Sequence, residues 1–67
     1  MKNIPKYKQE LIKALKKVST DKDFILNAGS AAGQNEEDAK RLIEYIENEK
    51  PTESEATIFA LEMYYSK

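Results

Sequence analysis

Histidine and cysteine, on which most catalytic and metal-binding sites depend, do not occur in this chain of 67 residues. Their absence removes the commonest general base, the commonest metal ligand, the thiolate nucleophile and every disulfide. The serines Ser30 and Ser54 have no base placed near them in the pattern of the sequence. The sequence therefore predicts a protein that is not an enzyme and that binds neither a metal ion nor a cofactor.

Carboxylates are the remaining groups that support acid–base or metal chemistry. Glu44, Glu47 and Glu49 lie along the side of a predicted helix that faces solvent, together with Arg41 and Lys50. Magnesium and calcium sites need oxygens that converge from several elements, and the spacing of a calcium-binding loop is absent. A general base needs surroundings that shift its pKa and a positioned partner, neither of which the sequence indicates. We interpret these carboxylates as a solvated helix surface.

The segment 27–33 is rich in small residues, with glycines at Gly29 and Gly33. A phosphate-binding loop would continue with Lys and then Ser or Thr, but Gln34 and Asn35 follow instead. We therefore expect a close helix crossing that ends at a glycine cap. Either glycine can end the helix; we favour Gly33, because glycine adopts the left-handed conformation at low cost.

The same region has the spacing of a helix-turn-helix unit. Ala28, Gly33, Ala39 and Leu42 occupy positions where such a unit has small and apolar residues. The helix that would enter the DNA groove, however, begins with the acidic residues 36–38, which the phosphates would repel. The pattern allows the shape of the unit but argues against sequence-specific reading of DNA.

Apolar residues recur every three or four positions in four stretches, which is the spacing of helices with one buried face. The first predicted helix covers residues 5–18 and has Pro5 in an early position, where its ring favours helical backbone angles. The second follows a weak capping box formed by Thr20 and Asp23 and ends at Gly33.

Two further helices are predicted in the second half of the chain. The third begins after the N-cap residue Asn35 and ends near Lys50. The fourth covers residues 53–65 and begins at a capping box formed by Thr52 and Glu55. No stretch shows the alternation of a β-strand.

These stretches predict a compact all-α fold of three to four short helices, arranged as a helix-turn-helix-like unit or an orthogonal bundle. Residues 1–67 are too few for more than a single domain. A chain of this length buries only about 60% of the surface that its unfolded form exposes, so its core is small. The predicted core consists of Tyr7, Leu11, Leu15, Val18, Phe24, Ile25, Ala28, Leu42, Ile43, Ile46, Phe59 and Met63.

No targeting or membrane-spanning segment is predicted. Met1 is followed by lysine and not by the apolar region of a signal peptide. The longest apolar run, residues 58–61, is far too short to cross a bilayer. We therefore expect a cytoplasmic protein without membrane contact, and the absence of cysteine agrees with that compartment.

The fourth predicted helix has apolar residues on two nearly opposite faces. One face consists of Ala56, Phe59, Ala60 and Met63. The other consists of Ile58, Leu61 and Tyr65. Such a helix is either surrounded by the rest of the fold or has one face that binds a partner. We predict that Ile58, Leu61 and Tyr65 form a protein interface, most simply in a homodimer.

A second surface is basic. Its lysines lie on the predicted solvent side of the first helix and are Lys6, Lys13, Lys16 and Lys17. Residues 1–33 carry seven lysines and three acidic residues, a net charge of +4, whereas residues 34–67 carry four basic and nine acidic residues, a net charge of −5. Such asymmetry occurs in proteins that contact nucleic acid, although lysines without arginine or interleaved aromatic residues favour phosphates over bases.

Two functions follow from these surfaces. The first is a small non-enzymatic helical binding or regulatory module that acts through protein contacts and self-associates. The alternative is a nucleic-acid-associated protein that contacts phosphates through the lysines of the first helix. A dimer would place two lysine surfaces side by side, so the two functions are compatible.

Overall fold

The computed structural model describes residues 4–66 and consists of four α-helices joined by short turns. They are α1 (Lys6–Val18), α2 (Lys22–Ala32), α3 (Glu36–Glu49) and α4 (Glu53–Tyr65). The predicted all-α class is confirmed, and no strand occurs among the described residues. No helix in this part of the chain has the length and apolar character needed to cross a membrane.

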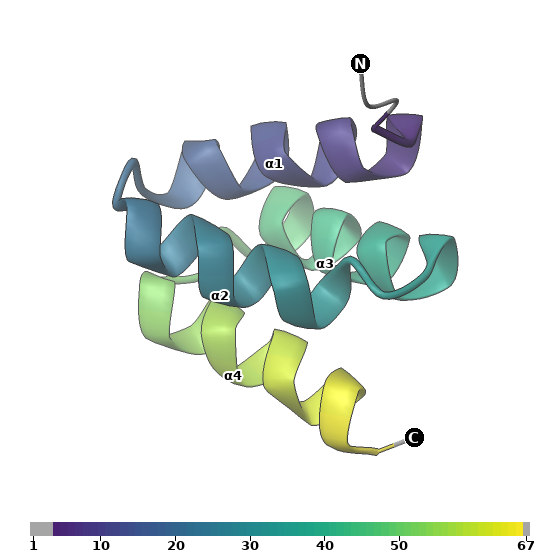
Figure 1. The fold of residues 1–67 in the computed structure, drawn as a ribbon. Helices are drawn as coiled ribbons and strands as arrows, with labels where there is room; N and C mark the ends of the chain where they lie inside the picture. The colour runs from purple at the N-terminus through teal and green to yellow at the C-terminus, as the bar shows by residue number, and fades with distance from the viewer. Residues whose placement is uncertain (1–3, 67) are drawn as a thin grey trace.

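The helices form a small bundle in which successive helices run in opposite directions (Figure 1). Figure 1 shows α1, α2 and α4 one below the other, with α3 behind them and both ends of the chain on the same side. The most extensive packing joins α1 to α3 and α2 to α4, while α1 also packs on α2 and α3 on α4. Since α2 and α3 contact each other only sparsely, a bundle describes the molecule better than a helix-turn-helix unit.

Two of the helices begin as the sequence predicts. In α4, Thr52 Oγ1 accepts a hydrogen bond from the Glu55 N–H at 3.3 Å, and Glu55 Oε1 accepts one from the Thr52 N–H at 2.9 Å. In α3, Asn35 Oδ1 accepts a hydrogen bond from the Asp38 N–H at 2.9 Å. Each bond satisfies a backbone donor that a helix start leaves without an intrahelical partner.

The start of α2 differs from the prediction. The N-cap is Asp21 rather than Thr20, and Asp21 Oδ1 accepts a hydrogen bond from the Asp23 N–H at 2.9 Å. Ser19 Oγ in turn accepts a hydrogen bond from the Asp21 N–H at 3.1 Å. The capping box predicted for Thr20 and Asp23 is therefore wrong, because a carboxylate one residue later occupies the capping position.

The C-terminal ends of α2 and α3 differ from the prediction in which residue has the left-handed conformation. Helix α2 ends before Gly33, as predicted, but Gly33 has a φ of −87° and is not left-handed. Glycine is needed there for space, because a Cβ at this position would collide with the carbonyl oxygen of Gly29. The left-handed cap is Lys50, with φ 48° and ψ 59°, and buried Pro51 follows it.

All twelve predicted core residues belong to the core or pack against it. Seven of the twelve buried hydrophobic residues are alanines, so the helices approach one another closely. Helix α1 packs on α2 beside Gly29, but a Cβ at Gly29 would lie 3.5 Å from Leu15 Cδ1, which is an ordinary van der Waals distance, so the predicted close crossing does not depend on this glycine. The buried alanines are Ala14, Ala28, Ala31, Ala32, Ala39, Ala56 and Ala60.

Candidate protein interface

The inner side of α4 packs on two neighbouring helices. Ala56 and Ala60 are fully buried there. Beside them, the ring of Phe59 stacks on that of Tyr45 from α3, with 4.3 Å between the ring centroids and 9° between the planes. These contacts determine the rotation of α4 about its axis, and therefore which of its residues point outward.

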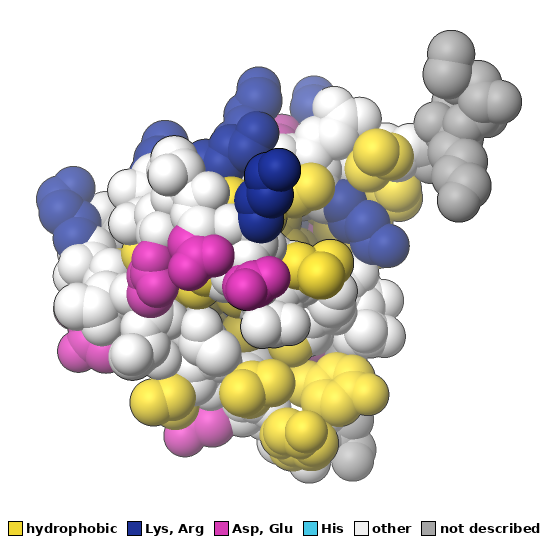
Figure 2. Space-filling view, turned by 60° about the vertical axis from the view of Figure 1, so that its left-hand side comes forward, with side chains coloured by type: hydrophobic (Ala, Val, Ile, Leu, Met, Phe, Trp, Pro, Cys, Tyr) yellow, Lys and Arg dark blue, Asp and Glu magenta, His cyan; other side chains and the backbone are white. Residues whose placement is uncertain are grey.

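The outer side of α4 is apolar and exposed. Ile58, Leu61 and Tyr65 have 56%, 37% and 76% of their surface exposed. We call these three residues the α4 outer face. Helix α4 packs on α2 and α3 at one edge of the bundle, so the alternative in which the other helices surround it is wrong. Figure 2 shows hydrophobic side chains gathered along the lower part of the molecule, where α4 lies.

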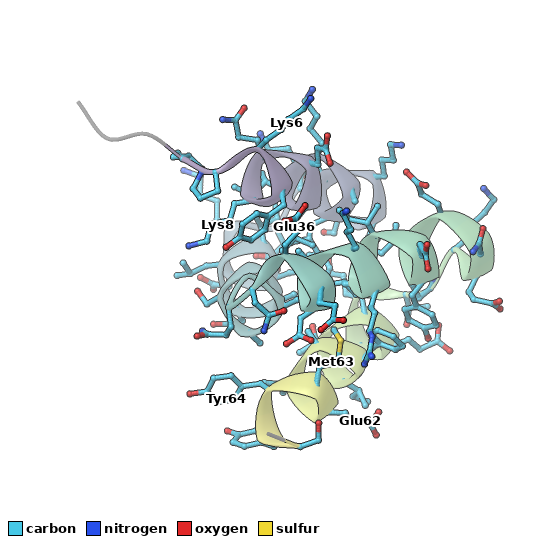
Figure 3. All side chains as sticks on the ribbon, turned by 90° about the vertical axis from the view of Figure 1, so that its right-hand side faces the viewer. Lys6, Lys8, Glu36, Glu62, Met63 and Tyr64 are labelled. Carbon is cyan, nitrogen blue, oxygen red and sulfur yellow. The ribbon has the colours of Figure 1, made fainter. Side chains whose placement is uncertain are left out.

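The surroundings of the α4 outer face are aromatic and acidic. Tyr64 contacts Tyr65 edge to face, with ring centroids 5.1 Å apart. Glu55 and Glu62 follow one edge of the face, seven residues apart. Residues 53–66, which make up α4 and its C-cap, include no lysine or arginine. In Figure 3 Met63 points into the bundle, whereas Tyr64 and Glu62 point outward on different sides of α4.

A second apolar surface, which the sequence analysis missed, lies between α1 and α2. It is an open groove with a volume of about 610 Å³. We call it the α1/α2 groove; its apolar lining includes Leu11, Ile12, Ile25 and Leu26 together with the backbone at Gly29 and Gly33. Leu26 is 65% exposed, which makes it one of the most exposed large hydrophobic residues described. Ile12 and Leu26 both lie outside the main apolar stripes of their helices. These two positions are the feature of the sequence that indicates an exposed apolar surface on α1 and α2.

Lysines border the α1/α2 groove on both sides. Lys8 and Lys16 lie on α1 and Lys22 on α2, and all three are exposed. Among residues 4–66, none of these lysines forms an ion pair with a carboxylate. Figure 2 shows hydrophobic side chains lying between basic ones in the upper part of the molecule.

The four lysines of the nucleic-acid alternative do not form one surface. All are exposed, but Lys16 lines the α1/α2 groove, whereas Lys6, Lys13 and Lys17 recur at seven and four residues on the opposite side of α1. Lys17 Nζ also lies 3.8 Å from Glu47 Oε2 on α3. Figure 3 shows Lys6 pointing away from the bundle and Lys8 pointing to the side on which α2 lies.

Several polar groups among the described residues form hydrogen bonds at helix ends. Asp38, the one carboxylate that is buried, accepts a hydrogen bond from Asn35 Nδ2 at 3.3 Å at the start of α3. The Ser30 carbonyl accepts a hydrogen bond from Gln34 Nε2 at 2.8 Å. Nowhere in the described part of the chain do three acidic, histidine or cysteine residues come together as a metal site would require.

Comparison of the chain with protein-family models, with curated proteins and with solved structures finds no match. The α4 outer face and the α1/α2 groove are therefore the observations from which its function is inferred.

Proposed function

We propose that this protein is a small non-enzymatic binding or regulatory module that acts through protein contacts and self-associates through the α4 outer face. The observation that supports the proposal is the exposure of Ile58, Leu61 and Tyr65 on a helix at the edge of the bundle. Adjacent apolar side chains of this size, bordered by polar residues, are typical of protein interfaces. The tyrosines of α4, Tyr64 and Tyr65, are of a residue type that interfaces favour.

Self-association would also stabilise so small a chain, because it would bury additional apolar surface. The core consists mostly of alanine and a few leucines, so the apolar surface buried within one copy is small. Each square ångström of apolar surface removed from water contributes about 25 cal/mol, and the α4 outer face is available for this. A dimer is the simplest product. The proposal places the module in the cytoplasm, and the absence of cysteine agrees with this.

Leu61→Glu tests the proposal. A carboxylate at this position would lose its hydration on association, so we expect the variant to remain monomeric at concentrations where the wild-type chain associates. Sedimentation velocity measures the association state, and circular dichroism measures helix content in the same samples. Asn48→Glu is the matched control, because it adds the same charge at an exposed position of α3 outside both surfaces.

The two variants separate an interface from a core position. A folded, monomeric Leu61→Glu beside a control that associates like wild type supports the proposal. If Leu61→Glu loses its helix content, Leu61 is needed for folding and is not an interface residue. If it associates like wild type, the α4 outer face is not the interface.

The nucleic-acid alternative rests on Lys6, Lys13 and Lys17, which share the outer side of α1. It is the weaker proposal, because Glu47 lies beside Lys17 and Lys16 is on another surface. Binding to duplex DNA through phosphates would weaken with salt, with a slope of about −0.9 per contact. Titration of a labelled duplex with wild type and with the double variant Lys13→Glu, Lys17→Glu tests it, and equal binding by both would refute it.

A further inference from the structure

Building on the proposed self-association, we propose that the α4 outer face of one copy docks into the α1/α2 groove of a second copy. The contact is then made by two different surfaces of the chain, and the interface is head-to-tail. Three observations support this arrangement. They are the similar lengths of the two surfaces, the opposite charges at their edges, and the like charges that a symmetric contact between two α4 outer faces would bring together.

The two surfaces match in length and in apolar character. The groove runs along α1 from Lys8 to Lys16, which is about 12 Å at the rise of an α-helix. The α4 outer face runs from Ile58 to Tyr65, which is about 10 Å. Three large apolar side chains therefore meet an apolar groove of similar length, in the way that an amphipathic helix binds a groove.

The lining of the groove includes two glycines. Gly29 and Gly33 contribute no side chain to it, and Gly33 is itself buried. Leu26 projects beside them with 65% of its surface exposed. In the docked arrangement Leu26 is covered together with the α4 outer face, so that exposed apolar side chains of the two surfaces bury each other.

The charges at the edges are complementary. Lys8 and Lys16, about 12 Å apart along α1, form one edge of the groove. Glu55 and Glu62, about 10 Å apart along α4, follow one edge of the α4 outer face. Lys22 adds a positive charge from α2. Docking brings these carboxylates to lysines that have no ion-pair partner among the described residues.

A symmetric contact between two α4 outer faces lacks this complementarity. Residues 53–66 contain Glu53, Glu55 and Glu62 and no basic residue, so two such helices would bring like charges together. The basic groove would stay uncovered, and so would Leu26. These charges therefore favour the groove of a second copy over its α4 as the docking site.

Complementation of two variants tests the arrangement. Leu61→Glu disables the α4 outer face but keeps the groove, whereas Leu26→Glu disables the groove but keeps the α4 outer face. We expect each variant alone to remain monomeric with wild-type helix content, and an equimolar mixture to form a one-to-one complex. The complex stops at two chains, because each member has only one working surface. Asn48→Glu in place of either variant is the control for added charge.

Sedimentation equilibrium of the separate variants and of their mixture distinguishes the outcomes. If Leu26→Glu self-associates like wild type and the mixture forms no one-to-one complex, the groove is not the docking site; the α4 outer face remains the interface and only the head-to-tail arrangement fails. If the wild-type chain is monomeric at every concentration, both this arrangement and the proposed self-association fail. Binding of the groove only to an acidic helix from another protein, with no self-association, would likewise overturn the proposal.

Discussion

Lys50 has a backbone conformation that is unfavourable for its side chain. Its φ of 48° and ψ of 59° are left-handed, and it is the only non-glycine residue with positive φ among those described. The conformation ends α3 and directs the chain into Pro51, which is buried. An L-residue with a Cβ is strained in this region by about 1–2 kcal/mol, whereas glycine is not.

Lys50→Gly is therefore expected to stabilise the protein. Part of the relief is lost because glycine makes the unfolded chain more flexible, which leaves a gain of about 0.5–1 kcal/mol in the free energy of unfolding. Urea denaturation followed by circular dichroism measures the change. A variant that is less stable than wild type would show that the Lys50 side chain contributes more than its conformation costs.

The capping residues give a second prediction with an internal control. Thr52→Ala removes the hydroxyl that accepts the Glu55 N–H at the start of α4, and we expect a loss of about 1 kcal/mol in stability. Thr20→Ala is the control, because α2 is capped by Asp21 and the change should alter stability by less than about 0.5 kcal/mol. An equal loss for both variants in thermal or urea unfolding would contradict these assignments.

At the level of the helices, close packing depends on alanine. Ala60 is fully buried on the inner side of α4, where a larger side chain would separate α4 from its neighbours. Ala60→Leu is expected to lower the free energy of unfolding by about 1–3 kcal/mol through overpacking. Leu26→Ala, measured in dilute solution, should change it much less, because Leu26 is largely exposed. Equal effects in urea denaturation would mean that the bundle adapts to larger residues.

The helices and their core could be predicted because both depend on local patterns. The capping box at Thr52 and Glu55 determined the start of α4, and the apolar stripe of α1 identified Leu11 and Leu15 as core residues. The start of α2 was misplaced by one residue because Thr20 and Asp21 are both capping types, and only the folded backbone shows which of them accepts the bond.

The α1/α2 groove could not be predicted in the same way. A groove is a property of two helices, and its existence depends on how α1 and α2 cross at Gly29. The sequence shows that Ile12 and Leu26 lie outside the main stripes, but not that they come together. The same holds for the lysines of α1, since helical spacing does not show that Lys16 lies beside α2.

At the scale of the whole molecule, the two apolar surfaces have borders of opposite charge. Lys8, Lys16 and Lys22 border the groove, and Glu55 and Glu62 border the α4 outer face. Head-to-tail contact pairs these charges, whereas contact between two α4 helices would not. The effect of salt on self-association therefore distinguishes head-to-tail contact from symmetric contact between α4 helices.

We expect sodium chloride to weaken self-association. Exposed ion pairs contribute about 0.2–1 kcal/mol and are screened at high ionic strength, so the Kd should rise roughly twofold to fivefold as the pairs are lost. Sedimentation equilibrium at low and high sodium chloride measures this change. Stronger association in salt would indicate that like charges face each other, as in a symmetric contact between α4 helices.

The most direct test of self-association is the solution mass of the wild-type chain across a concentration series, measured by light scattering. One copy has a mass of 7.7 kDa. We predict that the weight-average mass rises with concentration past that of one copy, and beyond two copies where the free groove and the free α4 outer face of a dimer find further partners. A mass that stays at 7.7 kDa at every concentration would contradict self-association and leave the α4 outer face without the role proposed for it.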